Sequence, residues 1–181
     1  MAPVDAGLVP LKMRPMAFDA PSELKFVNDL MTFYESSAGK TALEGRSLYL
    51  LRNADSKAKG LGFALAGNFY PDFLLWLVDD DSGHQWLSFV DPKGLRQVNL
   101  ADPKLQLFTE IKTLENSFND PKLTLNAFIL TDTAYGDLLN VTSVATKAEL
   151  EDRRLLFMDG TPGAYIGKML DRALARLSPS A

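Results

Sequence analysis

The chain of 181 residues contains no cysteine and only one histidine, His84. The absence of cysteine excludes disulfides, thiolate catalysis and every metal site that needs sulfur ligands. A lone histidine likewise argues against a histidine-containing triad or a paired-histidine site. Any chemistry in this protein is therefore expected to rest on carboxylates, lysines and hard cations.

Long apolar segments are also missing. No run approaches the ~18 residues that cross a bilayer, and FLLWLV is among the longest. The N-terminus lacks the basic and continuous apolar regions of a signal peptide, which favours a cytoplasmic protein with no membrane partner. With 46% hydrophobic and 23% charged residues, the chain can still bury an ordinary core.

The pattern of apolar residues predicts one domain after an irregular lead-in. Residues 1–18 hold three prolines and no periodicity, whereas helical and strand patterns recur over residues 19–181. Helices are expected over 18–36, 102–118, 144–154 and 164–177, and strands over 47–51, 62–70, 73–78, 85–90, 123–130 and 155–158. Ser22 or Asp19 is expected to cap the first helix. This order predicts an α/β fold in which a mixed central sheet lies between helices, an α/β/α sandwich.

Acidic residues interrupt the apolar pattern at two places, Pro71-Asp72 and Asp91-Pro92-Lys93. The first pair precedes one expected strand, and the second group ends the next. If these strands form a hairpin around the Asp-Asp-Asp-Ser-Gly turn, the two aspartates lie equally far from its centre and meet on adjacent strands. Asp91 and Lys93 are two residues apart and would point to one face. The sequence therefore predicts two carboxylates and one ammonium at one rim of the sheet.

Such a rim is suited to a divalent cation. Two facing carboxylates repel each other unless a cation lies between them. Mg²⁺ prefers hard oxygen ligands, and Mn²⁺ is expected to substitute for it. A divalent ion activates water and offsets charge on phosphorus, while a lysine can orient the water. The pattern thus indicates metal-assisted phosphodiester hydrolysis, which needs neither histidine nor cysteine.

The residues PD at 71–72 and DPK at 91–93, eighteen residues apart, resemble the PD-(D/E)xK motif of the restriction endonuclease-like nuclease superfamily. The segments SELKFVNDL, SLYLLRN, FYPDF, FVDPKGL and LNAFILT resemble more closely the C-terminal endonuclease domain of type III restriction enzyme restriction subunits and related helicase–nuclease proteins. This similarity covers residues 22 to 170.

The resemblance implies a restriction endonuclease-like sandwich over residues 19–181 and Mg²⁺-dependent cleavage of DNA. It implies Asp72, Asp91 and the Pro92 carbonyl as metal ligands. It also implies that Lys93 handles the attacking water and that Glu23, at the start of the first helix, is a further catalytic acid.

In the family that the chain resembles, the nuclease follows a helicase motor. The chain has no Walker A motif, because Tyr34 stands where the first glycine before Gly39-Lys40-Thr41 should be. The expected partners are therefore DNA, a separate helicase or ATPase module and, in a type III restriction system, a methyltransferase subunit. The net charge of −4 agrees with this, because the motor would supply most phosphate contacts.

Two other functions stay open. A nuclease-like fold can serve as a non-catalytic module for DNA docking or subunit contact, and a carboxylate-based Mg²⁺ phosphohydrolase can act on small nucleotides. The residues also have structural interpretations: Asp72 as a turn aspartate, Asp91 as half of a surface ion pair, and Glu23 as a first-turn acid favoured by the helix dipole. Trp76 and Trp86 are expected to pack across the hairpin rather than to stack on bases.

Overall fold

The structure is a computed structural model that describes residues 18, 20–53, 70–95, 103–138, 145–161 and 163–175. Its elements are α1 (Pro21–Glu35), α2 (Ser37–Ala42), β1 (Arg46–Arg52), β2 (Phe73–Asp79), β3 (Gln85–Lys93), α3 (Pro103–Phe118), β4 (Leu123–Thr131), the 3₁₀ helix η2 (Tyr135–Asp137), α4 (Lys147–Asp152), β5 (Leu155–Phe157) and α5 (Ala164–Leu174).

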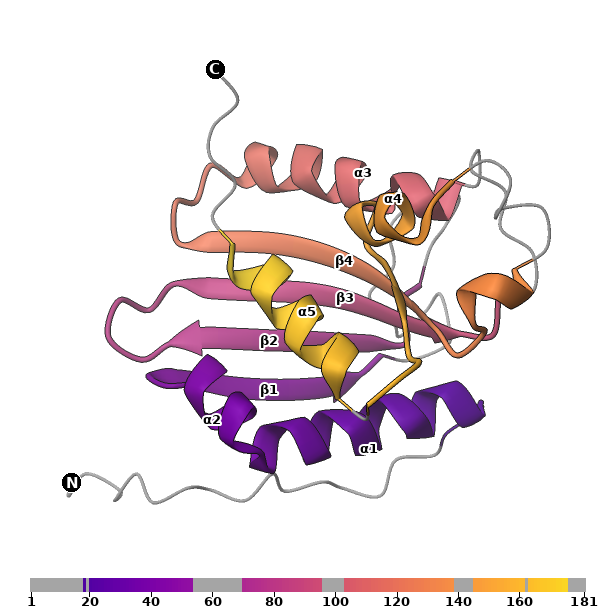
Figure 1. Cartoon of the computed structure of the whole chain (residues 1–181). Coiled ribbons are helices and arrows are strands. Elements are labelled where there is room, and N and C mark those ends of the chain that lie inside the picture. Colours follow the sequence, from indigo (N-terminus) through magenta and orange to yellow (C-terminus); the bar gives the residue numbers. More distant parts are fainter. Residues whose placement is uncertain are drawn as a thin grey trace.

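The five strands form one sheet in the order β1-β2-β3-β4-β5. β1, β2 and β3 are antiparallel neighbours, whereas β4 runs parallel to both β3 and β5. Helices lie on both sides of this sheet (Figure 1). The prediction of an α/β sandwich with a mixed central sheet is therefore confirmed.

Two buried clusters show which helices cover each face of the sheet. On one face, α1 and α5 pack against inward side chains of β2, such as Phe73 and Leu75. On the other face, Leu107 and Ile111 of α3 pack against Phe89 of β3 and the outer residues of β4. Successive residues of β2 and β3 alternate between the two clusters, as the pleat of a strand requires. This alternation assigns every residue of the hairpin to one face.

Several element bounds differ from the sequence-based expectation. β3 is expected to end at Val90 but continues to Lys93, because β4 keeps pairing with it there. Ser22 does not cap α1: Ala20 is the N-cap and Pro21 occupies the first helical position, which suits the fixed φ of proline. The expected strand over 62–70, apart from Tyr70, lies outside the described residues, as do Asp19 and residues 1–17 of the lead-in.

Two short elements have no clear sequence signal. α2 has six residues and η2 has three, so neither is long enough to produce a periodic apolar pattern. α2 begins where the Ser36 side chain accepts a hydrogen bond from the backbone N–H of Gly39. The helix expected over 144–154 is present as α4, and a capping box between Thr146 and Glu149 fixes its start.

Arg154 directly precedes the three-residue strand β5, and its carbonyl oxygen accepts a hydrogen bond of 3.0 Å from the backbone N–H of Ile129 in β4. Its φ of 67° is left-handed, and its guanidinium carbon lies 4.3 Å from the centre of the Phe108 ring and 5.5 Å from that of Phe128. Burial, and then the nearby Arg172, lower the pKa of Arg154 to about 10. The side chain therefore still carries its charge at neutral pH.

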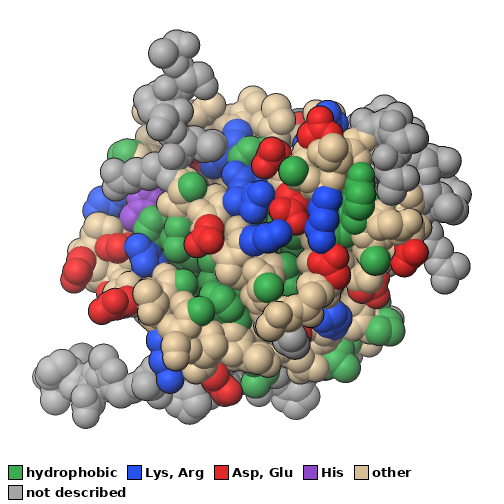
Figure 2. Space-filling view, in the orientation of Figure 1, with side chains coloured by type: hydrophobic (Ala, Val, Ile, Leu, Met, Phe, Trp, Pro, Cys, Tyr) green, Lys and Arg blue, Asp and Glu red, His purple; other side chains and the backbone are tan. Residues whose placement is uncertain are grey.

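Basic and acidic side chains are intermingled on the face that carries α4 and α5 (Figure 2). Lys168 Nζ lies 2.9 Å from Glu151 Oε1, and Arg172 lies within 4 Å of both Glu151 and Asp152. Charges on this face pair with each other, so they do not form a patch of one sign.

Candidate functional site

Asp72 and Asp91 face each other across β2 and β3. The register pairs Phe73 with Val90, so the next position toward this rim brings Asp72 opposite Asp91. On its other side Asp91 is paired with Ile129 of β4. The predicted meeting of the two aspartates on adjacent strands is therefore present.

The electrostatics of Asp72 reflect this arrangement. Burial is the largest cause that raises the pKa of Asp72 to about 8, and hydrogen bonding and charge repulsion from Asp91 raise it further. Lys93 lowers the pKa of Asp72, and Glu23 raises it by a smaller amount. Asp91, Lys93 and Glu23, the other three predicted catalytic residues, thus lie within electrostatic reach of Asp72 at one rim of the sheet.

Asp91 is the most buried member of this group. Its side chain has no exposed surface, and Lys93 Nζ lies 2.8 Å from its Oδ2. Within the described ranges, neither oxygen of Asp91 accepts a hydrogen bond of regular geometry. The interpretation of Asp91 as half of a surface ion pair is therefore wrong, because the carboxylate is enclosed while the lysine is only half-buried.

Glu23 reaches the same rim from α1 but is held by another cation. Its side chain is buried and forms an ion pair with Arg52, the last residue of β1. One residue before it, Ser22 Oγ donates a hydrogen bond of 3.2 Å to the carbonyl oxygen of Pro92. The carbonyl that the family resemblance implies as a metal ligand is therefore present at the rim and already accepts one hydrogen bond.

Three polar residues support this rim without being predicted at it: Ser22, which is expected only as a helix cap, Arg52 and Asn53. Asn53 is buried, its backbone N–H donates to the Asp72 carbonyl over 2.8 Å, and its Nδ2 donates to the Pro71 carbonyl over 2.9 Å. These bonds fix the start of β2. A sequence signal exists only for Arg52-Asn53, which directly follow the strand expected over 47–51.

The rim has the composition of a site for a hard cation with few protein ligands. Two adjacent carboxylates, one of them buried without a regular hydrogen bond, repel each other unless a cation lies between them. Among the described residues, no group of three or more histidine, cysteine or acidic side chains could hold a metal ion. Mg²⁺ needs only one or two protein carboxylates, since it retains water and binds substrate phosphates. The residues Asp72 and Asp91 therefore fit this ion.

The side chains of Trp76 and Trp86 do not pack against each other. Trp76 pairs with Leu87 and Trp86 with Leu77, so alternation directs the two rings to opposite faces. Trp86 lies in the core beneath α5, whereas Trp76 is 37% exposed beside Tyr49. The expectation that the tryptophans pack across the hairpin is wrong.

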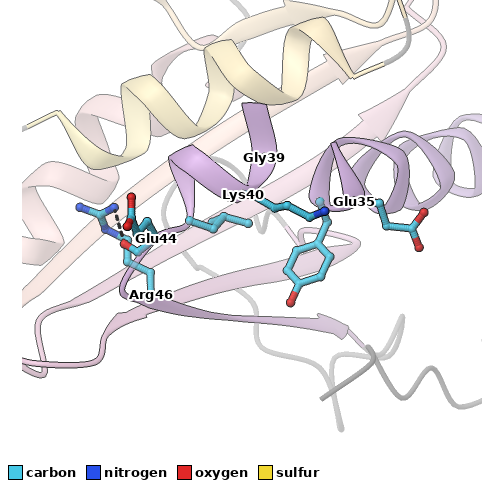
Figure 3. A pocket seen from close by; sticks show the side chains of 7 residues that line it. Glu35, Gly39, Lys40, Glu44 and Arg46 are labelled. Atoms are coloured by element: carbon cyan, nitrogen blue, oxygen red, sulfur yellow. Dashed lines mark hydrogen bonds between the residues drawn. The ribbon is translucent and has the colours of Figure 1, made fainter. Parts of the chain in front are cut away.

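A separate cavity of about 390 Å³ lies between α2, the end of α1 and the start of β1. Figure 3 shows its lining, which includes Glu35, Lys40, Glu44 and Arg46. Arg46 pairs in register with Asp79, at the end of β2 opposite the acidic rim. The lining carries two cationic and two anionic side chains, so its formal charges cancel.

No protein-family model matches the sequence, and no curated protein or solved structure matches it. The resemblance to type III restriction endonuclease domains therefore stays a prediction from the sequence motifs. None of the helices in the described ranges is long and apolar enough to cross a membrane.

Proposed function

We propose that this chain is a Mg²⁺-dependent endonuclease domain that hydrolyses DNA phosphodiester bonds in the cytoplasm. The observation that carries the proposal is the meeting of Asp72 and Asp91 on adjacent strands, with Lys93 against Asp91. The element order α1-β1-β2-β3-α3-β4, with β4 parallel to β3, supports the restriction endonuclease-like fold.

Each residue of the rim would have a defined role. Asp72 and Asp91 would hold a divalent ion, and the Pro92 carbonyl would be a third ligand. When bound, Mg²⁺ or Mn²⁺ would lower the pKa of water and offset negative charge on the phosphate. Lys93 would orient the attacking water and stabilise charge on the phosphate oxygens, while Glu23 would assist through hydrogen bonds to ordered water.

The overall reaction is a substitution at phosphorus. The oxygen of water forms a bond to phosphorus and loses its proton to solvent. One P–O ester bond breaks, and the leaving oxygen takes up a proton. The products are a phosphate monoester and an alcohol at the two new ends of the DNA strand.

A nicking assay on supercoiled plasmid with Mg²⁺ or Mn²⁺ tests this function. We expect Asp91→Ala and Lys93→Ala to lose at least about a hundredfold of the wild-type rate, as removal of a catalytic group usually does. Asp81→Ala and Lys40→Ala, which remove the same charge types at exposed positions, are expected to cut at the wild-type rate. Cleavage by pure Asp91→Ala at the wild-type rate would exclude the proposed site.

One observation favours a non-catalytic module for DNA docking or subunit contact. Glu23 is bound by Arg52, and Lys93 covers Asp91, so two cations already neutralise part of the rim. Calorimetry with Mn²⁺ separates the two functions. If the rim is a nuclease site, the wild type binds Mn²⁺ and the Asp91→Ala variant does not. If the chain is a docking module, neither the wild type nor the variant gives a heat of binding. A helicase or ATPase module and a methyltransferase subunit are the proposed protein partners of the nuclease.

A further inference from the structure

An aromatic pair lies exposed on the half of the sheet formed by β1 and β2. Tyr49 and Trp76 are register partners, their ring centres are 6.5 Å apart, and they are 52% and 37% exposed. Leu51, two residues further along β1, is 48% exposed on the same face. Large aromatic side chains are usually buried or engaged, so an in-register exposed pair on a sheet indicates a binding surface.

This surface is continuous with the acidic rim. Leu74 and Trp76 of β2 alternate with the residues that face α1 and α5, and Leu74 packs with the α3 cluster; Asp72 directly precedes this strand. Asp91 follows Phe89 on the same face of β3. Four residues of strand, about 13 Å, separate Asp72 from Trp76. A polymer bound at the rim can therefore pass over both rings within a few monomer units.

On the basis of the nuclease function proposed above, we propose that Tyr49 and Trp76 form a stacking platform for unpaired bases. The substrate would then carry a single-stranded segment next to the bond that is cut. Aromatic side chains stack on bases of any sequence, because every base has a π-face. The planes of the two rings are inclined by 62°, so each ring offers its own face to a base. In a duplex the faces of the bases are already stacked, so exposed aromatic faces distinguish an unpaired strand from a paired one.

The small size of the exposed apolar surface favours a nucleic acid strand over a second copy of the chain. Among the described residues, three large exposed apolar side chains lie on this face: Tyr49, Leu51 and Trp76. Three residues are far fewer than the ~20–30 residues that each partner contributes to a stable protein interface. The acidic turn Asp79–Asp81 would repel phosphates at the far end of the hairpin, so the bound segment is confined to the stretch between this turn and the rim.

Binding in EDTA tests the platform without cleavage. Fluorescence anisotropy would compare a labelled oligothymidylate with a blunt duplex of equal length, for wild type, Tyr49→Ser, Trp76→Ser and the double variant. We expect tighter binding of the single strand by wild type, and about tenfold weaker binding for each lost ring. Phe118→Ser, which removes a 56% exposed ring from the end of α3, is expected to bind as wild type. Tyr49→Phe should retain binding, which separates stacking from loss of the hydroxyl.

Tryptophan fluorescence gives an independent readout. In a Trp86→Phe background the emission comes from Trp76 alone, since the chain has two tryptophans. Addition of oligothymidylate is expected to quench this emission through stacking. Unchanged emission at saturating oligonucleotide, absence of oligonucleotide binding by wild type, or wild-type affinity in the double variant would each overturn the platform. A change of oligomeric mass in the double variant with unaltered DNA affinity would also overturn it, in favour of a contact between copies.

Failure of the platform and failure of the nuclease give different results. Quenching and single-strand binding without any nicking in Mg²⁺ or Mn²⁺ would support the platform and exclude the nuclease. Equal cutting of blunt and tailed duplexes by wild type and double variant would overturn the platform and support the nuclease.

Discussion

The guanidinium carbon of Arg52 lies 5.8 Å from the centre of the Phe73 ring, so the cation that pairs with Glu23 also stacks on the first residue of β2. Arg52 thereby connects α1, β1 and β2 at the acidic rim. Because Glu23 is buried, its charge needs this partner or another cation.

Arg52→Gln is expected to destabilise the protein by about 2–3 kcal/mol, because a buried carboxylate loses its cation. Because Arg52 is less buried than Glu23, the expected loss of stability is smaller than for a fully buried ion pair. Urea unfolding measures the loss. Arg153→Gln, at an exposed position, is the matched control. The double variant Glu23→Gln/Arg52→Gln should lose less than the sum of the single losses. Strict additivity would contradict the pairing.

Asn53→Ala is expected to cost about 1–3 kcal/mol, because the Pro71 carbonyl loses a buried donor. Under the proposed function it should also lower the rate of nicking, since the start of β2 positions Asp72. Asn28→Ala, on the exposed side of α1, should leave both stability and nicking unchanged or slightly improve stability. Equal unfolding midpoints for Asn53→Ala and wild type would mean that this hydrogen bond does not hold the strand.

The stability contribution of Asp72 should depend on pH. Its pKa is about 8 in the folded protein against 3.8 for the free side chain, so the folded state binds a proton that the unfolded state has lost. The free energy of unfolding is therefore expected to fall as pH rises from about 4 to about 8 and then to level off. Asp72→Asn cannot titrate and should become more stable relative to wild type across this window.

Urea unfolding at intervals between pH 4 and pH 9 checks this prediction, with Asp81→Asn as an exposed control in the turn. Mn²⁺ at the alkaline end should stabilise wild type more than Asp72→Asn, because a cation can replace the proton. A pH-independent difference between wild type and Asp72→Asn would show that the carboxyl group ionises normally.

Gly39→Ala should be strongly destabilising. A β-carbon built at Gly39 would lie 1.9 Å from the carbonyl oxygen of Phe33, so α2 could not keep its contact with α1. We expect a loss of about 3 kcal/mol or more, in the range of other overpacked backbone contacts. Gly136→Ala, which meets no atom within 4 Å, is the control and should be near neutral. Thermal unfolding of both variants measures the difference.

The sequence allows prediction of the sheet hairpin and of its acidic rim because both follow from short-range rules. The turn at Asp79–Gly83 and the alternation of β2 and β3 determine that Asp72 and Asp91 meet on one face. The spacing of two residues also predicts that Lys93 and Asp91 point to the same face, and their ion pair agrees with this. These relations need only the twofold period of a strand and the symmetry of a hairpin.

The support of the rim depends on contacts between distant elements. Ser22 donates to Pro92, seventy residues away, and Glu23 pairs with Arg52, which lies twenty-nine residues further along the chain. Neither contact has a local sequence pattern, because each depends on how α1 packs beside the sheet. The different faces of Trp76 and Trp86 do follow from strand alternation: they are ten residues apart, but the register pairs each with a leucine.

The charged guanidinium of Arg154, beside β4, has a consequence for self-association. β5 pairs with three residues of β4, so within the described residues most of that strand has no neighbour on this side. An exposed strand edge can recruit a strand from another molecule, and natural proteins often prevent this with a charged side chain. Arg154, which is buried between Phe108 and Phe128, places a positive charge beside this edge, and an incoming strand would have to pack against that charge. The residue would thereby act against sheet-to-sheet aggregation.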